Sequence, residues 1–359
     1  VLSFLEWCTI TKKFLWPLFI YIYIRRCGMV TESANERQSE IAKKAWITIR
    51  KKRIEKIKAE NESIEDYLFN KDMRTVYQGT YKINPPLIKP SKLTWIEKGG
   101  IGKELSDGWS INYAIGCTHA CRFCYVDQIH KKYGAKRADK GVYRSWGNYF
   151  YVPDNINEAI DETKWQKWKG VEVMMSSTHD PYLPQLVKIT RKILEKALPY
   201  GVKFCIQTRS PLVIKDFELL SEFKEFVRVQ ISVATMNHVL AKLIEPRVAD
   251  PEARFEILRK AKDYGLHTGV ILAPIFPAVK VRPDYEADLR EMAKELVEIQ
   301  PDHIFGESLH ARGSNLGEVE VALGERVNLN GFDTIVEKKF KSVMSEFHLK
   351  GKWWREIHY

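Results

Sequence analysis

The stretch Gly116-Cys117-Thr118-His119-Ala120-Cys121-Arg122-Phe123-Cys124-Tyr125 places three cysteines within eight residues, at the spacing C-x3-C-x2-C. Three thiols on so short a loop can surround one soft metal centre, and thiolate sulfur is the protein ligand that iron–sulfur clusters use. Because a cubane 4Fe–4S cluster has four irons, ligation by these three cysteines leaves one iron without a protein thiolate. An open iron of this kind is what a catalytic site needs, whereas a structural site is closed.

Two simpler interpretations of the cysteine loop stay open at this stage. A structural zinc site usually has a fourth Cys or His at matching spacing. His119 is a candidate by residue type, but it lies inside the loop itself. The other alternative is a chance cluster of cysteines.

From residue 110 onward, short apolar runs alternate with amphipathic segments. Near-continuous apolar strands that alternate with helices predict a parallel sheet covered by helices. Helices are expected near residues 216, 257 and 291, and Asp180 and Pro181 are expected to begin a helix that runs to about Leu198. Six such units favour an α/β fold, a partial (β/α)6 TIM-like barrel. The predicted strands are residues 110–116, 171–177, 203–208, 226–234, 266–274 and 303–309.

Polar blocks follow the predicted strands at the points where the strands end. In parallel α/β barrels, ligands bind at the carboxyl ends of the strands, so these blocks are candidates for the site. The blocks are Ser176-Ser177-Thr178-His179-Asp180, Thr208-Arg209-Ser210-Pro211, Ser232 with Glu245-Pro246-Arg247, and Glu307 with His310-Ala311-Arg312-Gly313-Ser314-Asn315.

The cysteine loop, the barrel pattern and these ordered blocks, together with Asn112-Tyr113, resemble the radical S-adenosylmethionine (SAM) superfamily, in the branch related to spore photoproduct lyase. The resemblance covers roughly residues 90–320. It implies a 4Fe–4S cluster held by Cys117, Cys121 and Cys124, with SAM bound to the open iron through its amino and carboxylate groups. It also implies reductive cleavage of SAM to a 5′-deoxyadenosyl radical that abstracts hydrogen from the substrate. An electron donor such as ferredoxin or flavodoxin is then expected.

The resemblance also suggests cofactor-binding residues in the polar blocks. Aromatic residues of the cysteine loop are expected to shield the cluster or lie near the adenine of SAM. Polar residues of the later blocks are expected to contact its ribose, carboxylate or amino group. Packing, capping and ion pairing are the alternative roles. The expected residues are Phe123, Tyr125, Ser176, Thr178, Ser232 and Arg247.

Three further residues near the expected barrel mouth have two interpretations each. Glu307 and Arg312 would either reach the substrate or form an ion pair with each other. Asp180 is expected to cap a helix rather than to bind a ligand.

The hydrogen donor is the point at which this sequence departs from the family branch that it resembles. Spore photoproduct lyase uses a cysteine beyond the second strand, whereas the nearest equivalent here is Ser177. A serine hydroxyl cannot donate a hydrogen atom in the same way. Cys205, in the third predicted strand, is expected to be an ordinary buried cysteine. The resemblance therefore implies the cofactors and the radical chemistry but leaves the substrate open.

The charge of the chain favours an acidic partner. The 359 residues carry a net charge of +11 and the pI is near 9.1, which makes nucleic acid the first candidate. Basic residues gather at 43–58, at 131–144 and in the tail Lys352-Trp353-Trp354-Arg355, whose aromatic residues would stack on bases. A solvated basic surface is the alternative.

The six cysteines do not form a disulfide framework, because three are clustered and three are scattered. This usage predicts a reducing, cytoplasmic location.

The two ends of the chain are expected to lie outside the barrel. Residues 1–28 form an apolar extension whose run at 14–24 is short for a membrane helix, which needs about 20 residues. We interpret it as upstream of a start at Met29, with a membrane anchor as the alternative. Residues 29–109 are expected to be a basic helical arm and linker, 110–320 the core barrel, and 321–359 a helical and aromatic tail.

Two other functional classes remain alternatives. One is an iron–sulfur protein that only transfers electrons, and the other is a nucleic-acid-binding protein with a structural cluster. Only the enzyme would form 5′-deoxyadenosine from SAM.

Overall fold

The computed structural model describes residues 76–91, 105–142 and 144–355. The apolar segment 1–28 and the basic block 43–58 therefore lie outside the described residues, and only the later part of the predicted arm and linker falls within them. Within the described part of the chain, no helix is long and apolar enough to cross a membrane.

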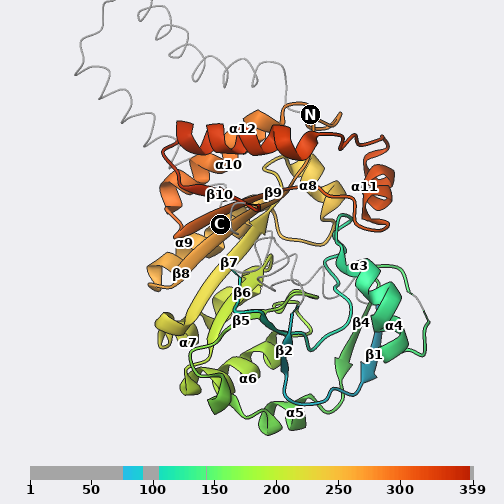
Figure 1. Ribbon diagram of the computed structural model, residues 1–359, viewed down its shortest axis with the longest axis vertical. Coiled ribbons are helices and arrows are strands. Elements are labelled where there is room, and N and C mark those ends of the chain that lie inside the picture. Colours follow the sequence, from blue (N-terminus) through green and yellow to red (C-terminus); the bar gives the residue numbers. More distant parts are fainter. Residues whose placement is uncertain (1–75, 92–104, 143, 356–359) are drawn as a thin grey trace, which may run out of the picture. The chain divides into compact units, whose positions relative to one another are not determined.

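The centre of the molecule is an eight-stranded, curved sheet (Figure 1). All six predicted strands are present, and each pairs in parallel with its neighbour, as a (β/α)6 arrangement requires. In sheet order they are β3 (Trp109–Ile111), β5 (Glu172–Met175), β6 (Lys203–Thr208), β7 (Val227–Val233), β8 (His267–Ile275) and β9 (His303–Ser308).

Two further strands complete the edges of this sheet. β10 (Gly351–Trp353) pairs in parallel with β9, and β2 (Ile88–Pro90) pairs antiparallel with β3. Because the strand order runs from β10 at one edge to β2 at the other, the sheet is an open, partial barrel. The predicted barrel is thus confirmed. It is extended by one strand from the predicted linker and by one from the predicted tail.

Helices cover the outer face of the barrel (Figure 1). α9 packs on β7 and β8, and α12 packs on β9 and β10. The helices after the cysteine loop are α3 (Val126–Ile129), a π-helical turn (His130–Gly134), α4 (Ala135–Ala138), α5 (Ile156–Glu162), α6 (Val187–Ala197), α7 (Phe217–Ser221), α8 (His238–Ile244), α9 (Pro251–Asp263), α10 (Tyr285–Ile299), α11 (Asn315–Leu323) and α12 (Phe332–Glu346).

A small second sheet supports the cysteine loop from outside the barrel. It consists of β1 (Tyr77–Tyr81) and β4 (Tyr149–Pro153), which pair in parallel. Ile115 forms an isolated antiparallel bridge with Tyr151 of β4. This bridge explains why β3 ends at Ile111 although a strand was predicted to residue 116. The chain leaves the barrel there and pairs with the small sheet.

The predicted start of the helix after β5 is wrong. α6 begins at Val187, and its N-cap position is Leu186 rather than Asp180. The Asp180 carboxylate accepts hydrogen bonds from Thr208 Oγ1 at 2.7 Å and from the backbone N–H of Tyr182 at 2.8 Å. Residues 181–186 form turns instead of a first helical turn. The Asp180 carboxylate links the loop after β5 to the end of β6.

Candidate cofactor site

The cysteine loop begins at a position that only glycine can fill. Gly116 has φ +96°, and a Cβ there would lie 2.3 Å from the carbonyl oxygen of Tyr149. This close approach fixes the direction in which the chain enters the loop. The loop is then held from the other side by the backbone N–H of Arg122, which donates to the carbonyl oxygen of Ile244 at 2.8 Å.

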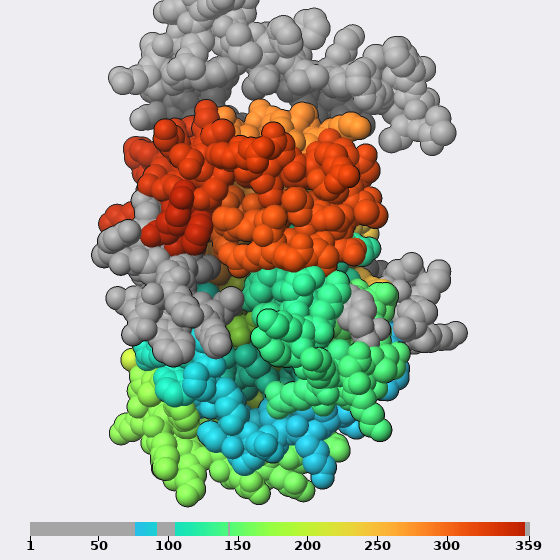
Figure 2. Space-filling model, turned by 45° about the vertical axis from the view of Figure 1, so that its right-hand side comes forward, coloured from blue at the N-terminus to red at the C-terminus, as the bar shows by residue number. Residues whose placement is uncertain are grey.

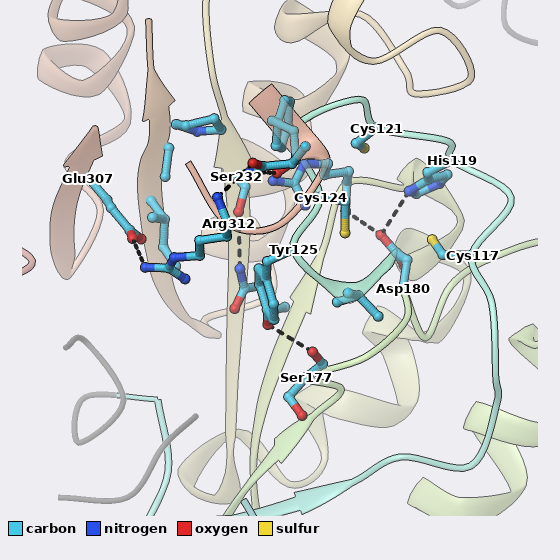
Figure 3. Close-up of a pocket in the computed structure, with 18 of the residues that line it drawn as sticks. Cys117, His119, Cys121, Cys124, Tyr125, Ser177, Asp180, Ser232, Glu307 and Arg312 are labelled. Atoms are coloured by element: carbon cyan, nitrogen blue, oxygen red, sulfur yellow. Dashed lines mark hydrogen bonds and ion pairs between the residues drawn. The ribbon is translucent and has the colours of Figure 1, made fainter. Parts of the chain in front are cut away.

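The three cysteines line one cavity of about 480 Å³ at the carboxyl ends of the barrel strands. Cys117 and Cys121 are buried, and Cys124 is half-buried. In Figure 3 the cysteines lie on one side of this cavity, and Glu307 lies on the other. The cavity has room beside the thiols for a ligand, in the size range of small-molecule sites.

Burial dominates the electrostatics of the three thiols. It raises the pKa of Cys117 and that of Cys124 to about 12, and it raises the pKa of Cys121 as well. Iron would favour the thiolate form that burial opposes. Arg209 provides nearby positive charge, since burial lowers its pKa but the Cys121 sulfur and the Glu245 carboxylate raise it more. Two buried thiols and one half-buried thiol, with an adjacent cation and free space in front of them, fit a cluster with one open iron.

Asp180 joins the cysteine loop to the barrel. Its Oδ2 accepts the backbone N–H of Arg209 at 2.7 Å and lies 3.4 Å from His119 Nδ1. Burial lowers the pKa of His119, so the ring is neutral at pH 7. His119 is thus held by Asp180. Among the described residues, no group of three or more His, Cys, Asp or Glu side chains is placed so that it could hold one metal ion.

The aromatic residues of the cysteine loop lie in the cavity wall, as expected. The Phe123 ring packs edge-to-face on Phe276 at 6.0 Å between centroids. The Tyr125 hydroxyl donates to the carbonyl oxygen of Ser177 at 2.9 Å, and the Arg312 guanidinium lies 5.7 Å from the centre of the Tyr125 ring (Figure 3). Both rings therefore cover the space beside the third cysteine.

The polar residues expected after β5 and in β7 also line the cavity. Ser176 Oγ donates to Asn112 Oδ1 at 2.9 Å and accepts the backbone N–H of Thr178 at 3.2 Å. Ser232 Oγ accepts a hydrogen bond from Gln207 Nε2 at 3.1 Å. The Ser176 hydroxyl also accepts the backbone N–H of His179, so its hydrogen-bonding capacity is used within the protein. The Ser232 hydroxyl only accepts, so its proton is left for a ligand.

Arg247 is the one expected cofactor residue that does not line the cavity. Its guanidinium donates to the carbonyl oxygen of Gly147 at 2.6 Å and to Asn148 Oδ1 at 3.1 Å. The reason is the turn after α8, because Glu245 of the same tripeptide points inward to Arg209 and Arg254. Arg247 consequently points away from the cavity.

Glu307 and Arg312 form the ion pair that was one of their two interpretations, with 3.0 Å between the charged groups. Both line the cavity opposite the cysteines (Figure 3). Burial raises the pKa of Glu307, and Arg312 acts against this. His310 Nε2 lies 3.6 Å from the same carboxylate. This wall is charged, whereas the floor contributed by β5 and β8 is apolar.

The sequence assigned no role to several residues that the structure places in or beside the site. Asn112 bridges β3 and the loop after β5, because its Oδ1 accepts both Ser176 Oγ and the backbone N–H of Ser177. Trp146 lines the cavity, and its buried indole N–H has no hydrogen-bond partner among the described residues. Asn315 donates from Nδ2 to the carbonyl oxygen of Phe123 at 2.9 Å. Asn112 could have been suspected only because it is a polar residue close to the cysteine motif. Nothing in the sequence around Trp146 indicated a place in the site.

Cys205 is fully buried in β6, as expected, and donates weakly to Gln230 Oε1 at 3.4 Å. It does not line the cavity. The thiols among the described lining residues are therefore those of the cysteine loop. Ser177, which the sequence suggested as the nearest equivalent of the hydrogen-donor cysteine, lines the cavity.

Comparison with known proteins agrees with this site. The sequence profile of the Radical SAM superfamily matches residues 111–283. The chain is 57% identical over 297 residues to the uncharacterized protein ORF301 of Acidianus two-tailed virus, a match that covers 82% of this chain and 99% of that protein. It is 31% identical over 169 residues to an uncharacterized protein of Methanocaldococcus jannaschii, covering 46% of this chain and 60% of the relative.

Among solved structures, a spore photoproduct lyase variant with dinucleoside spore photoproduct is similar in fold. The TM-score is 0.53 at 14% identity, covering 77% of this chain and 81% of that chain. A partial parallel barrel with a C-x3-C-x2-C loop at the carboxyl ends of its strands is typical of proteins of the radical SAM type. The chain belongs to the radical SAM superfamily.

Proposed function

We propose that this protein is an enzyme that cleaves SAM reductively at a 4Fe–4S cluster held by Cys117, Cys121 and Cys124. The observation that carries the proposal is the placement of these three thiols along one wall of a cavity at the carboxyl ends of the strands. When bound, the cluster and SAM supply an organic radical that abstracts hydrogen from a substrate. The protein's own work is to bind, orient and shield these groups.

The lining residues divide this work between them. Ser176, Thr178 and Ser232 offer hydroxyl groups to SAM, and Phe123 and Tyr125 cover the cluster side of the cavity. These roles follow from their places in the wall and, for Ser232, from the hydroxyl proton that it keeps for a ligand.

The Glu307–Arg312 pair is proposed to face the substrate. It lies across the cavity from the cysteines, and Arg312 also covers the Tyr125 ring. A substrate held against this wall would be separated from the cluster by the SAM-binding space.

Anaerobic reconstitution tests the proposal. We expect about four irons and four sulfides per chain, followed by formation of 5′-deoxyadenosine with SAM and dithionite. Cys121→Ala should remove the brown absorbance and this product. Cys205→Ala is the matched control, because Cys205 is equally buried but lies outside the cavity, and it should keep both.

Two outcomes would favour the alternatives. Stoichiometric zinc in a folded, iron-free protein would contradict the cluster. A complete cluster without 5′-deoxyadenosine formation would favour an electron-transfer protein or a nucleic-acid-binding protein with a structural cluster.

For the substrate we propose nucleic acid, and for the electron source a donor such as ferredoxin or flavodoxin in a reducing, cytoplasmic compartment. The support for nucleic acid is the rim segment that follows the cysteine loop. Lys132, Lys136 and Lys140 are exposed along it, and the Tyr133 ring is 61% exposed beside them. Lysines next to an exposed aromatic ring suit a phosphate backbone and a stacked base.

The tail contributes less to this surface than its sequence suggested. Trp353 is fully buried, so it is not available to stack on a base. Arg355 is paired with Asp333 at 2.8 Å and with Glu337 at 2.7 Å. Trp354 lines the cavity, and its indole N–H donates to Asp333 Oδ1 at 3.1 Å.

A further inference from the structure

The segment 244–247, which begins at the last residue of α8, makes three contacts with the cysteine loop and its surroundings. The carbonyl oxygen of Ile244 accepts the backbone N–H of Arg122 within the loop. Glu245 is buried and holds Arg209, the cation beside the thiols, at 2.9 Å. Arg247 reaches around the outside to the turn Trp146–Asn148. One short segment therefore contacts the backbone of the loop, the Arg209 guanidinium beside the thiols, and the turn Trp146–Asn148 that covers the loop from outside. We call this turn the outer cover.

The outer cover is in direct contact with the loop. Gly147 is buried, and a Cβ at this residue would lie 2.2 Å from the Cβ of Ala120. Ala120 lies between the first two cysteines and has φ +57°. No layer of water fits between surfaces at this distance. The turn therefore excludes solvent from the side of the cysteine loop that faces away from the cavity.

The same turn also reaches the cavity. Trp146, the residue before Gly147, lines the cavity and packs edge-to-face against His130 at 5.7 Å between ring centroids. A shift of Gly147 away from Ala120 would thus move a wall of the cavity. What holds the turn from the barrel side is the Arg247 guanidinium, with bonds of 2.6 Å and 3.1 Å to consecutive residues.

We propose that Arg247 is a positioning residue for the cluster. It keeps the turn Trp146–Asn148 closed over the cysteine loop and so limits the access of water and oxidants to the iron–sulfur centre. This inference rests on the proposed function, because it requires that a cluster be bound by the loop. It also gives Arg247 a role outside the cavity in place of the SAM contact that its sequence position suggested.

The test compares iron retention in Arg247→Gln and in the unchanged protein, both reconstituted as holoenzyme. A chelator added anaerobically should remove iron about tenfold to a hundredfold faster from the variant, the range found when outer contacts of a metal site are lost. The midpoint potential of the cluster should become more positive, because water stabilises the more negatively charged reduced state. The melting temperature of the iron-free protein should stay close to that of the unchanged protein.

Two further variants keep the test decisive. Arg247→Lys keeps the charge but offers no planar fork, and it should restore iron retention only in part. Asn148→Ala removes one of the two acceptors, gives a smaller effect, and replaces Arg247→Gln should that variant fail to fold. Arg290→Gln on α10 is the matched control, because it loses exposed pairs with Glu346 and Glu286 far from the loop in sequence.

Equal rates of iron loss in Arg247→Gln and the unchanged protein would overturn the inference. Weaker SAM binding with unchanged iron retention would overturn it as well, since Arg247 would then act on SAM. Failure of the unchanged protein to take up iron is a distinguishable result, because it contradicts the proposed function itself.

Discussion

Asp180 shows how much of the site depends on single side chains with distant partners. Its carboxylate joins Thr208 and Arg209 at the end of β6 to His119 in the cysteine loop. The sequence Asp180-Pro181 has the residue types of a helix start, and the helix was predicted there. The prediction failed because the carboxylate bonds to a residue 28 positions later, which no local pattern reports.

His303 gives a prediction for pH dependence. Burial, together with the positive charge of Arg228, lowers the pKa of His303 to about 3. In the unfolded chain the same ring is protonated below about pH 6.5. Between these two values the unfolded state binds more protons, so the free energy of unfolding falls as the pH falls, by up to about 1.4 kcal/mol per pH unit.

We therefore expect His303→Gln to reduce the loss of stability of the iron-free protein between pH 6 and pH 4, measured by urea unfolding. His238→Gln is the control, because this ring lies at the surface with 41% of its side chain exposed. Parallel pH profiles for His303→Gln and the unchanged protein would show that His303 does not carry this effect.

At the scale of elements, the strands with continuous apolar runs were predictable and the short edge strands were not. β6 matches its prediction at both ends, β7 and β8 differ from theirs by one residue at each end, and β9 ends one residue earlier than predicted. β2 and β10 have three residues each and form because an edge of the sheet is open beside them. Their sequences, which contain Pro90 and Lys352, carry too little periodicity to predict a strand.

β10 is nevertheless important for stability, because it places Trp353 in the core. The indole is fully buried against Phe340, at 5.3 Å between ring centroids. It lies over Gly306 of β9, where a Cβ would come within 2.8 Å of the ring. One of the two tryptophans in the aromatic tail that was expected to stack on bases thus fills the core beside β9.

Trp353→Ala should lower the free energy of unfolding by about 3–5 kcal/mol, the usual cost of truncating a buried aromatic side chain. Trp354→Ala is the matched comparison one residue later. It should cost less, because Trp354 is only half-buried. Denaturant unfolding of the two iron-free variants measures the difference, and equal losses would contradict the assignment of Trp353 to the core.

At the scale of the molecule, the net charge of +11 is distributed unevenly between paired and exposed cations. Within the rim, Lys131 lies 2.7 Å from Asp127, and Arg144 lies 3.0 Å from Asp139. Lys132, Lys136 and Lys140 are exposed instead. In Figure 2 the green segment that carries them lies at the surface beside the orange-red C-terminal part, to which Gln128 is bonded through Ser314. Composition predicted a basic protein, but only the structure distinguishes the cations that are paired with carboxylates from the exposed lysines.

This separation allows a sharp test of nucleic acid as the substrate. Each phosphate contact releases counterions, so the logarithm of the binding constant falls with the logarithm of the salt concentration by about 0.7 to 0.9 per contact. If Lys132, Lys136 and Lys140 each contact a phosphate, replacing all three by Ala should reduce this slope by about 2 to 3. The formation of 5′-deoxyadenosine without substrate should not change, because none of the three lines the cavity.

The matched control replaces Lys188, Lys192 and Lys196 of α6 by Ala, which removes the same charge from the outer surface of the barrel. A general effect of net charge would change both slopes equally, whereas a binding surface on the rim changes only the first. Fluorescence anisotropy with single- and double-stranded oligonucleotides, repeated over a series of salt concentrations, measures both slopes. Equal slopes in the two triple variants, or no binding to either oligonucleotide at low salt, would direct the search for the substrate to a protein side chain or a small molecule.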